Sequence, residues 1–346
     1  MSKLIIFDAD SMIFTVAWKF KDKKVKAMVT MHLNKFISEI ILNSGATHYI
    51  GFFGSKKADS KPNFRYSVDP NYKINRPETP EWVVRWRPVL FEAMEEKWGF
   101  VGVDGMEADD ACSISAKYYR ELKNTDGTPV YEEVIVAACD KDLEQIPGII
   151  YYNYQKHTMH PINTFDAAMK LAVQTLMGDA TDGIKGLGGI GPKIAVRVLS
   201  ECTTLVQLKW TVARMYAAKE EELRDKAEKE AFASTKLEME NDPDLDLSNL
   251  TEKQIERQVR IRTKAKMADV MFGSMPGGWK NYLRTQQQLL TLLTEAPDWF
   301  VIPEPVKSTL ISNVAVVESD PISDVITEGN KTVVSKNKPV DNFLYL

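Results

Sequence analysis

Hydrophobic and polar positions in the first half of the chain switch repeatedly between strand-like and helix-like patterns. Short apolar runs predict buried strands at 3–7, 47–53, 132–138 and 149–154. Apolar residues at helical spacing predict helices from residue 11, around 29–41, over 80–98 and over 108–122. Pro88 should kink or split the third of these helices. Strands that alternate with helices predict an α/β domain with a mostly parallel central sheet and flanking helices.

The second half of the chain has a different pattern. Past residue 163 it becomes helical, so we expect an α/β domain at 1–162 and a helical domain at 163–302. Within the latter, residues 214–269 contain 12 Lys or Arg and 14 Asp or Glu, which predicts a charged helical insertion facing solvent. Residues 303–346 are rich in Pro, Ser and Val without a sustained period, and are predicted to form an extended tail.

Composition restricts the class of protein. The chain has 346 residues, of which 44% are hydrophobic and 27% charged, enough to bury a core and typical of a globular protein. No apolar run approaches the roughly 20 residues needed to cross a bilayer, so we expect no membrane association. The three cysteines form no CxxC pair and are too sparse for a disulfide framework, which indicates a reduced, cytoplasmic setting.

Acidic residues are clustered where strands end and helices begin or end. These clusters comprise Asp8, Asp10, Glu107, Asp109, Asp110, Asp140, Asp142, Asp179 and Asp182. The carboxyl ends of parallel strands meet at one edge of a sheet, so separate loops can bring these acids into one cleft. Crowded carboxylates raise one another's pKa, and divalent cations remove that repulsion. Solvated turn or helix-capping acids are the alternative interpretation, which is the better one for any single pair.

An oxygen-only donor set is typical of hard cations such as Mg²⁺ or Mn²⁺. The chemistry that uses such a set of carboxylates is phosphoryl transfer. The formal net charge is −4, but without the nine clustered acids the 44 Lys and Arg outnumber the remaining 39 acids. A mildly basic remaining surface is compatible with binding to a phosphate backbone.

A glycine-rich loop follows the last acidic pair. It contains Gly183, Gly186, Gly188, Gly189 and Gly191, and Pro192 and Lys193 then begin a predicted helix. Glycines let a backbone approach a phosphate closely, and the helix would direct its N–H groups at that phosphate. Such a hairpin would contact a duplex backbone without reading bases, although a tight structural turn is the simpler alternative.

Basic and aromatic residues alternate in residues 56–87. This stretch has eight Lys or Arg against four acids, interleaved with Phe, Tyr and Trp, a combination typical of single-strand binding. Lys73 and Arg76 are the two cations that we expect to contact phosphate. The alternative is a solvated loop and a helix on which Trp82 and Trp86 partly face the core.

Five ordered motifs over residues 3–200 resemble the 5′-nuclease (flap endonuclease, PIN-like) family, and most closely its bacteriophage 5′→3′ exonuclease / RNase H branch. They are IIFDADSMIF, VDPNYKINR, MEADDA, ACDKDLEQIPG and MGDATDGIKGLGGIGPKIA. The resemblance implies a PIN-like domain with an arch or clamp at 55–100, a helix-hairpin-helix-like motif in the helical part, and a metal-dependent nuclease. Its substrates would be DNA with 5′ ends, flaps or nicks, and RNA–DNA hybrids.

The resemblance also assigns roles to individual residues. The first Mg²⁺ or Mn²⁺ would be held by Asp8, Glu107, Asp109, Asp110 and Asp140, with Asp10 as a further candidate. The second would be held by Asp142, Asp179 and Asp182. Lys73 and Arg76 would steer the scissile phosphate at the base of the arch. The segment from Gly183 to Lys193 would hold duplex DNA, and in this family it often also binds K⁺.

One position departs from the family pattern. The family usually has an Asp just after the second strand, where this chain has Gly54. Asp59 is nearby in sequence and is a candidate substitute.

Two rival interpretations remain open. A haloacid-dehalogenase-type phosphatase would use Asp8 as nucleophile and Asp10 as general acid, but its metal motif needs one more residue than GDATD provides. A junction-binding protein with a weakened active site is the other, suggested by Gly54.

The C-terminus contains a candidate partner motif. Its last four residues, 343–346, are all large and apolar, which suggests that they pack against something. Folding back onto the protein's own core is one possibility. The other is docking, because DNFLYL is similar to the C-terminal peptides by which phage replication proteins bind a sliding clamp.

Overall fold

The computed structural model describes residues 2–22, 25–54, 63–242, 245, 250–274 and 277–308. It divides into two compact units. Of the described residues, the first contains those up to Lys170 and those from Thr291 to Ser308, and the second contains Leu171–Leu290. The sequence had suggested a boundary at 162/163 and had assigned residues 291–302 to the helical part.

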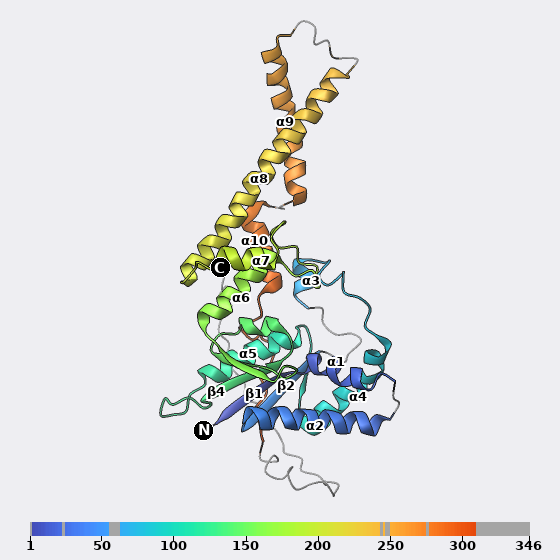
Figure 1. The fold of residues 1–346 in the computed structure, drawn as a ribbon, viewed down its shortest axis with the longest axis vertical. Coiled ribbons are helices and arrows are strands. Elements are labelled where there is room, and N and C mark those ends of the chain that lie inside the picture. Colours follow the sequence, from blue (N-terminus) through green and yellow to red (C-terminus); the bar gives the residue numbers. More distant parts are fainter. Residues whose placement is uncertain are drawn as a thin grey trace. The chain divides into compact units, whose positions relative to one another are not determined.

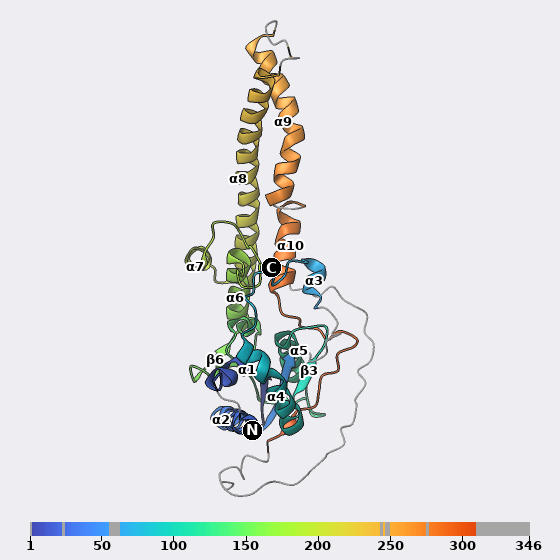
Figure 2. The same ribbon diagram turned by 90° about the vertical axis from the view of Figure 1, so that its right-hand side faces the viewer.

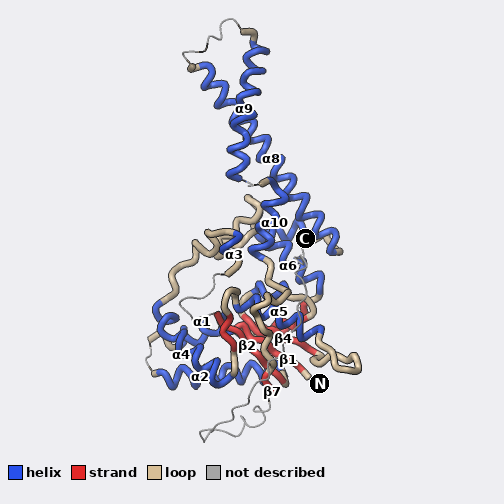
Figure 3. The backbone as a smooth tube through the Cα atoms, turned by 180° about the vertical axis from the view of Figure 1, so that it is seen from behind, coloured by secondary structure: helices blue, strands red, loops and turns tan. Residues whose placement is uncertain are grey.

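The first unit is an α/β domain around one twisted sheet (Figures 1 and 3). Its helices are α1 (Ala9–Lys19), α2 (Lys26–Ser44), α3 (Arg65–Val68), α4 (Glu81–Trp98) and α5 (Ala108–Glu121). Its strands are β1 (Lys3–Asp8), β2 (His48–Gly54), β3 (Val101–Val103), β4 (Glu133–Ala138), β5 (Ile149–Asn153), β6 (Thr158–Ile162) and β7 (Val306–Lys307). A 3-10 helix, Lys141–Gln145, follows β4.

The strand order is β3-β2-β1-β4-β5-β6, with β7 added to β2. The pairs β1–β2, β1–β4, β2–β3 and β4–β5 are parallel, whereas β5–β6 and β2–β7 are antiparallel. The expected α/β fold with a mostly parallel sheet is therefore confirmed. Because β1 lies between two parallel neighbours, its last residue, Asp8, lies at the same edge of the sheet as the ends of β2 and β4.

Alternating side chains of the strands divide the core into two layers. Ile5 and Phe7 pack in one cluster with α1, α2 and α4, whereas Leu4 and Ile6 pack in the other with α5. Figure 1 shows α2 and α4 on one side of the sheet and α5 on the other. Both faces of β1 are buried, so its sequence is a continuous apolar run.

Three details of this unit differ from the sequence expectations. Helix α4 is continuous through Pro88, and both Pro88 and Val84, whose carbonyl loses its donor, are exposed to water. Strand β6 was not predicted, because it is mostly exposed and has no continuous apolar run. It contains Pro161, which an edge strand can accommodate. Strand β3 has only three residues, too few for a pattern to register.

A buried ion pair joins three parts of the first unit. The Arg65 guanidinium, 2% exposed, donates from Nη1 and Nη2 to Asp110 at 2.6 and 2.9 Å. Nη2 also donates to the carbonyl of Thr291 at 3.1 Å, and the amide of Leu293 donates to Asp110 at 2.9 Å. The pair thus connects the segment after β2, the start of α5 and the chain that returns at 291–293.

The second unit is helical. It contains the second half of α6 (Thr164–Met177), then α7 (Pro192–Leu199), α8 (Leu205–Glu240), α9 (Glu252–Ser274) and α10 (Gly278–Leu290). Figure 2 shows α8 and α9 running side by side, and residues 214–269 contribute to both. Within the described ranges, the helices are all too short or too polar to cross a lipid bilayer.

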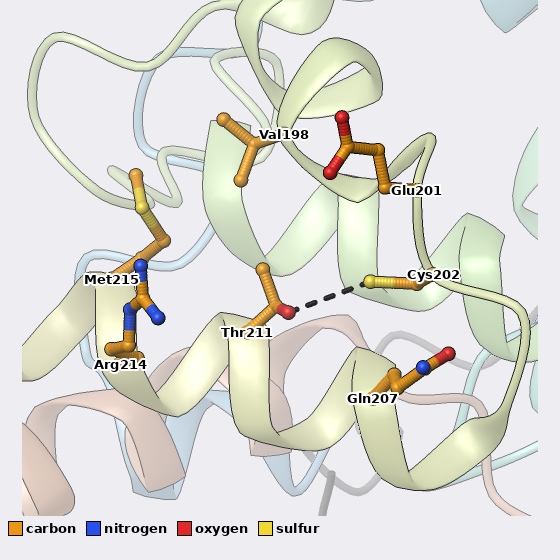
Figure 4. Close-up of a pocket in the computed structure, with 7 residues that line it drawn as sticks. All are labelled: Val198, Glu201, Cys202, Gln207, Thr211, Arg214 and Met215. Carbon is orange, nitrogen blue, oxygen red and sulfur yellow. Dashed lines mark hydrogen bonds between the residues drawn. The ribbon is translucent and has the colours of Figure 1, made fainter.

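A cavity of about 320 Å³ lies where α7 meets α8 (Figure 4). It is lined by Val198, Glu201, Cys202, Gln207, Thr211, Arg214 and Met215. Cys202 and Thr211 are hydrogen-bonded at 3.4 Å. Only one of the seven lining residues is acidic, so the cavity does not offer the clustered carboxylates that the sequence indicated.

Replacing Arg65 with Met should destabilise the first unit by about 3–5 kcal/mol, because the buried Asp110 carboxylate would lose the cation that neutralises it. The matched control is Arg85→Met, which removes an exposed ion pair with Glu81 and should cost no more than about 0.5 kcal/mol. Urea denaturation of both variants gives the free energies of unfolding. Equal losses in the two variants would mean that the buried pair has no special role.

Candidate metal centre

Asp8 and Asp10 lie at the junction of β1 and α1. Asp8 ends the strand, caps the helix and is 5% exposed, while Asp10 lies in the first turn of α1. Burial raises the pKa of Asp8 well above its ordinary value, and the neighbouring Asp10 carboxylate raises it further. Asp109 and Asp140 add to the same effect. Asp8, Asp10, Asp109 and Asp140, from three separate segments of the chain, are therefore close enough for their charges to interact.

The start of α5 supplies the next acids. Glu107 is the N-cap and forms a capping box with Asp110, which explains why an acid-rich stretch begins a helix. Asp109, between them, accepts a hydrogen bond from the amide of Asp110 at 2.7 Å. Burial, followed by the nearby Asp110 carboxylate, raises the pKa of Asp109 to about 7.

Asp110 is already fully bonded within the protein. Its Oδ1 accepts from Arg65 and Leu293, and its Oδ2 accepts from Arg65 and from the amide of Glu107 at 3.4 Å. A carboxylate has about four lone-pair positions, and these four donors occupy them. In this structure Asp110 positions the start of α5, and its direct binding of a metal ion stays a prediction.

Lys73 and Glu107 form an ion pair beside these acids. Tyr72 donates to the other Glu107 oxygen at 3.1 Å. Lys73 has a φ of +62°, a left-handed conformation that non-glycine residues seldom adopt and that is found at functional sites. Arg76 is exposed, and its amide donates to the carbonyl of Lys73 at 3.1 Å. Of the two predicted cations, the structure brings Lys73 to the carboxylates.

Asp140 and Asp142 follow β4. Asp140 is exposed, and its Oδ1 accepts from the amide of Asp142 at 2.9 Å, which begins the 3-10 helix. The carboxylate of Asp140 raises the pKa of both Asp8 and Asp109, so it belongs to the same group of acids. Asp142 is the second residue of the 3-10 helix and is half-buried.

The chemistry of these donors fits a hard divalent cation. Asp8 and Asp109 are held as neighbouring carboxyl groups whose burial disfavours their charge, and a cation would reverse that preference. Among the residues that the structure describes, no three His, Cys, Asp or Glu side chains are arranged to hold an ion as they stand. The support for a metal centre is therefore the chemistry of these donors.

Two participants were missed by sequence reasoning. Burial raises the pKa of Asp10, and the charges of Arg87 on α4 and of Lys73 partly oppose this rise, so both cations lie in the electrostatic surroundings of that carboxylate. Arg87 shares a helical stripe with the buried residues Val83 and Leu90, and this spacing could have identified it. The second is the amide of Gly54, which donates to both oxygens of Asp10 at 3.1 and 3.0 Å. Asp59, the candidate substitute, lies outside the described residues.

Asp179 and Asp182 share one tight turn in the second unit. Oδ1 of Asp179 accepts from the amides of Thr181 and Asp182 at 2.8 and 3.3 Å. The backbone of Asp179 also exchanges two hydrogen bonds with Ile184, both of 2.8 Å. The Asp179 carboxylate thus holds the backbone of Thr181 and Asp182 within the loop that connects α6 to α7.

The glycines of this loop have two different functions. Gly186 crosses Gly178 so closely that a Cβ on Gly186 would lie 2.3 Å from the Gly178 nitrogen. Its amide and carbonyl are bonded to Gln286 and Tyr282, so Gly186 is a packing residue. By contrast, a Cβ on any of Gly188, Gly189 or Gly191 would meet no atom within 4 Å. Gly183 has a φ of +77°, which suits glycine in a turn.

Lys193 is exposed at the second position of α7, directly after Pro192. The open glycines precede the helix and Lys193 lies in its first turn. This part of the loop therefore has the space and the charge for the predicted phosphate contact.

Comparisons with known proteins agree with the sequence motifs. Residues 3–170 match the family described as 5′-3′ exonuclease, N-terminal resolvase-like domain. The chain is 25% identical over 213 residues to flap endonuclease Xni of Aliivibrio salmonicida, covering 58% of this chain and 78% of that protein. It is 30% identical over 151 residues to DNA polymerase I of Rhizobium leguminosarum, covering 41% of this chain and 14% of the polymerase.

Among solved structures, the T5 D15 protein co-crystallised with metal ions aligns with a TM-score of 0.46 and 15% identity, covering 83% of this chain and 95% of that one. The chain thus spans only a small part of DNA polymerase I but most of Xni. The resemblance seen in the five motifs is confirmed by the match of residues 3–170 to the family described as 5′-3′ exonuclease, N-terminal resolvase-like domain.

Proposed function

We propose that this chain is a metal-dependent 5′→3′ exonuclease and flap endonuclease that hydrolyses phosphodiesters in DNA. The observation that carries the proposal is the group of opposed carboxylates at the carboxyl edge of a parallel sheet, with Lys73 paired to one of its members. The family match over residues 3–170 and the similarity to flap endonuclease Xni support the same activity.

We assign the first ion, Mg²⁺ or Mn²⁺, to Asp8, Glu107, Asp109 and Asp140, and the second to Asp142, Asp179 and Asp182. When bound, such ions supply an activated water and stabilise charge on the phosphate. Asp110 contributes indirectly, because its bonds to Arg65 and Leu293 fix the start of α5, from which Glu107 and Asp109 project. K⁺ binding at the glycine loop belongs to the same proposal.

The cations of the first unit would bind the substrate phosphate. Lys73 is held beside the acids by Glu107, and Arg87 faces Asp10 from α4. A phosphate that enters would bring negative charge to these two side chains and to Arg76. Charged donors that are positioned before the reaction stabilise the transition state without reorganising. We therefore give Lys73 and Arg76 the role of orienting the scissile phosphate.

The substrates follow from the same assignments. We propose DNA with 5′ flaps, nicks or ends, together with RNA–DNA hybrids. Gly188, Gly189, Gly191 and Lys193 would contact the duplex backbone. A sliding clamp remains a proposed partner through residues 340–346, which lie outside the described residues.

The phosphatase interpretation is weakened by Asp10. A general acid must present a proton toward the leaving group, whereas both Asp10 oxygens accept the amide hydrogen of Gly54. The alternative of a junction-binding protein with a weakened active site was suggested by the lack of an acid at Gly54. The carboxylate of Asp10 lies at this position, hydrogen-bonded to the Gly54 amide, so an acid is present there.

The direct test of the activity is cleavage of a labelled 5′-flap DNA and a matched 3′-flap DNA, each with Mg²⁺ or EDTA. We expect cleavage of the 5′ flap only, and only with Mg²⁺. Asp109→Asn should reduce the rate by about 100-fold or more while flap binding in Ca²⁺ is retained. The exposed Asp22→Asn is the matched control and should cleave normally. Cleavage in EDTA, or hydrolysis of p-nitrophenyl phosphate without flap cleavage, would contradict the proposal.

A second prediction concerns pH. The folded protein holds the pKa of Asp109 at about 7, above the ordinary value of 3.8, chiefly through burial. Protonated Asp109 therefore contributes stability below its unfolded pKa, and this contribution is lost as pH rises through about 7. In EDTA, wild-type protein should lose stability relative to Asp109→Asn between about pH 4 and about pH 7, with no further loss above this range, and Mg²⁺ should reverse the loss at the higher pH. Urea denaturation measures both; a pH-independent difference would refute the assignment.

A third prediction concerns the duplex contact. Lys193→Ala should weaken binding to duplex DNA irrespective of sequence and reduce the slope of log affinity against log salt by about one, because one phosphate contact is lost. Lys35→Ala, on the exposed surface of α2, is the control and should leave the slope unchanged. Fluorescence anisotropy over a salt series gives the slopes, and a sequence-dependent defect would count against the contact.

A further inference from the structure

Gly54 and Asp10 form a close contact between two adjacent strand ends. Gly54 is the last residue of β2, which pairs in parallel with β1. Its amide donates to Oδ1 of Asp10 at 3.1 Å and to Oδ2 at 3.0 Å. The Asp10 carboxylate, which projects from the first turn of α1, therefore lies against the backbone end of β2.

The carboxylate also occupies the space that a side chain at position 54 would need. A Cβ atom built on Gly54 would lie 3.1 Å from Oδ2 and 3.7 Å from Oδ1 of Asp10. This is closer than ordinary van der Waals contact with a carboxylate that is itself held by two hydrogen bonds. The absence of a side chain on β2 and the presence of an acid on α1 are therefore parts of one arrangement.

The surroundings of Asp10 are those of the metal centre. Asp8 lies two residues before it at the end of β1, and the charges of Lys73 and of Arg87 on α4 act on it, although burial still raises its pKa. The Gly54 amide engages each oxygen once, so each retains a further lone-pair position. A carboxylate oriented by a backbone amide and still able to accept is suited to bind a cation.

We propose that Asp10 is a ligand of the divalent ion, and that it supplies from α1 the carboxylate that β2 lacks at position 54. The Gly54 amide holds this carboxylate in place. The inference rests on the proposed metal centre and adds to it a residue that is not needed for capping α1, because Asp8 is already the N-cap.

The test measures metal binding itself, by isothermal titration calorimetry of the full chain with Mn²⁺. Asp10→Asn keeps a carbonyl oxygen that can accept from Gly54 but removes the charge, so the fold should persist. We expect its affinity for Mn²⁺ to fall by about 10- to 100-fold, with no loss of melting temperature in EDTA. The control, Asp22→Asn, makes the same change of charge at an exposed position of the same unit and should bind like wild type.

A second variant moves the carboxylate back to the strand. Asp10→Ala combined with Gly54→Asp removes the acid from α1 and places one on β2, where the smaller alanine leaves room for it. It should recover Mn²⁺ affinity relative to Asp10→Ala alone, by about tenfold or more. Failure to recover would refute the claim that Asp10 substitutes for an acid at position 54.

The outcomes also separate this inference from the proposed function. Wild-type protein that binds Mn²⁺ and cleaves 5′ flaps, together with Asp10→Asn of unchanged Mn²⁺ affinity, would overturn the inference and leave the nuclease intact. Wild-type protein that binds no Mn²⁺ would overturn both. A fall in affinity for Asp10→Asn that Asp22→Asn does not share would support the inference.

Discussion

Repulsion among buried carboxylates is the constraint on which the rest of the site depends. The parallel register places the end of β1 beside the ends of β2 and β4, so acids that follow these strands are brought together whether or not their charges are compatible. Burial and mutual repulsion then raise the pKa of Asp8 and Asp109. When these buried carboxylates are ionised, their repulsion destabilises the folded state, and a divalent cation would remove that repulsion. The fold and the proposed metal chemistry are thus linked by the same charges.

The acids of the site differ in whether a cation of the protein neutralises them. Asp110 is neutralised permanently by Arg65, and this pair also fastens the returning segment at Thr291 and Leu293. Burial and neighbouring carboxylates instead raise the pKa of Asp8 and Asp109, while Glu107 is paired with Lys73 at the edge of the group. One ion pair therefore stabilises the frame, whereas Asp8 and Asp109 are the acids whose repulsion a divalent ion would relieve. This division explains why neighbouring residues of one motif, Asp109 and Asp110, have different roles.

Much of this was predictable because it depends on local pattern. The strands β1, β2, β4 and β5 are apolar runs, and the acids that follow them are visible in sequence. The partner of Arg65 was not predictable, because 45 residues separate it from Asp110 and 226 from Thr291. For the same reason the sequence could show that position 54 lacks an acid but could not show that Asp10 lies against it. Arg87 was missed for another reason: it is one of eight cations in the basic stretch 56–87, and its position on the apolar stripe of α4 was not considered.

The most direct test of the central claim is to locate the ions. Crystals of the full chain grown with a 5′-flap DNA and Mn²⁺ should give anomalous scattering peaks at the metal centre. The account predicts a peak with carboxylate oxygens of Asp8 and Asp109 at roughly 2.0–2.4 Å, the range of hard divalent cations. Anomalous density elsewhere on the protein, with the side chains of Asp8 and Asp109 bound only to protein groups, would contradict it.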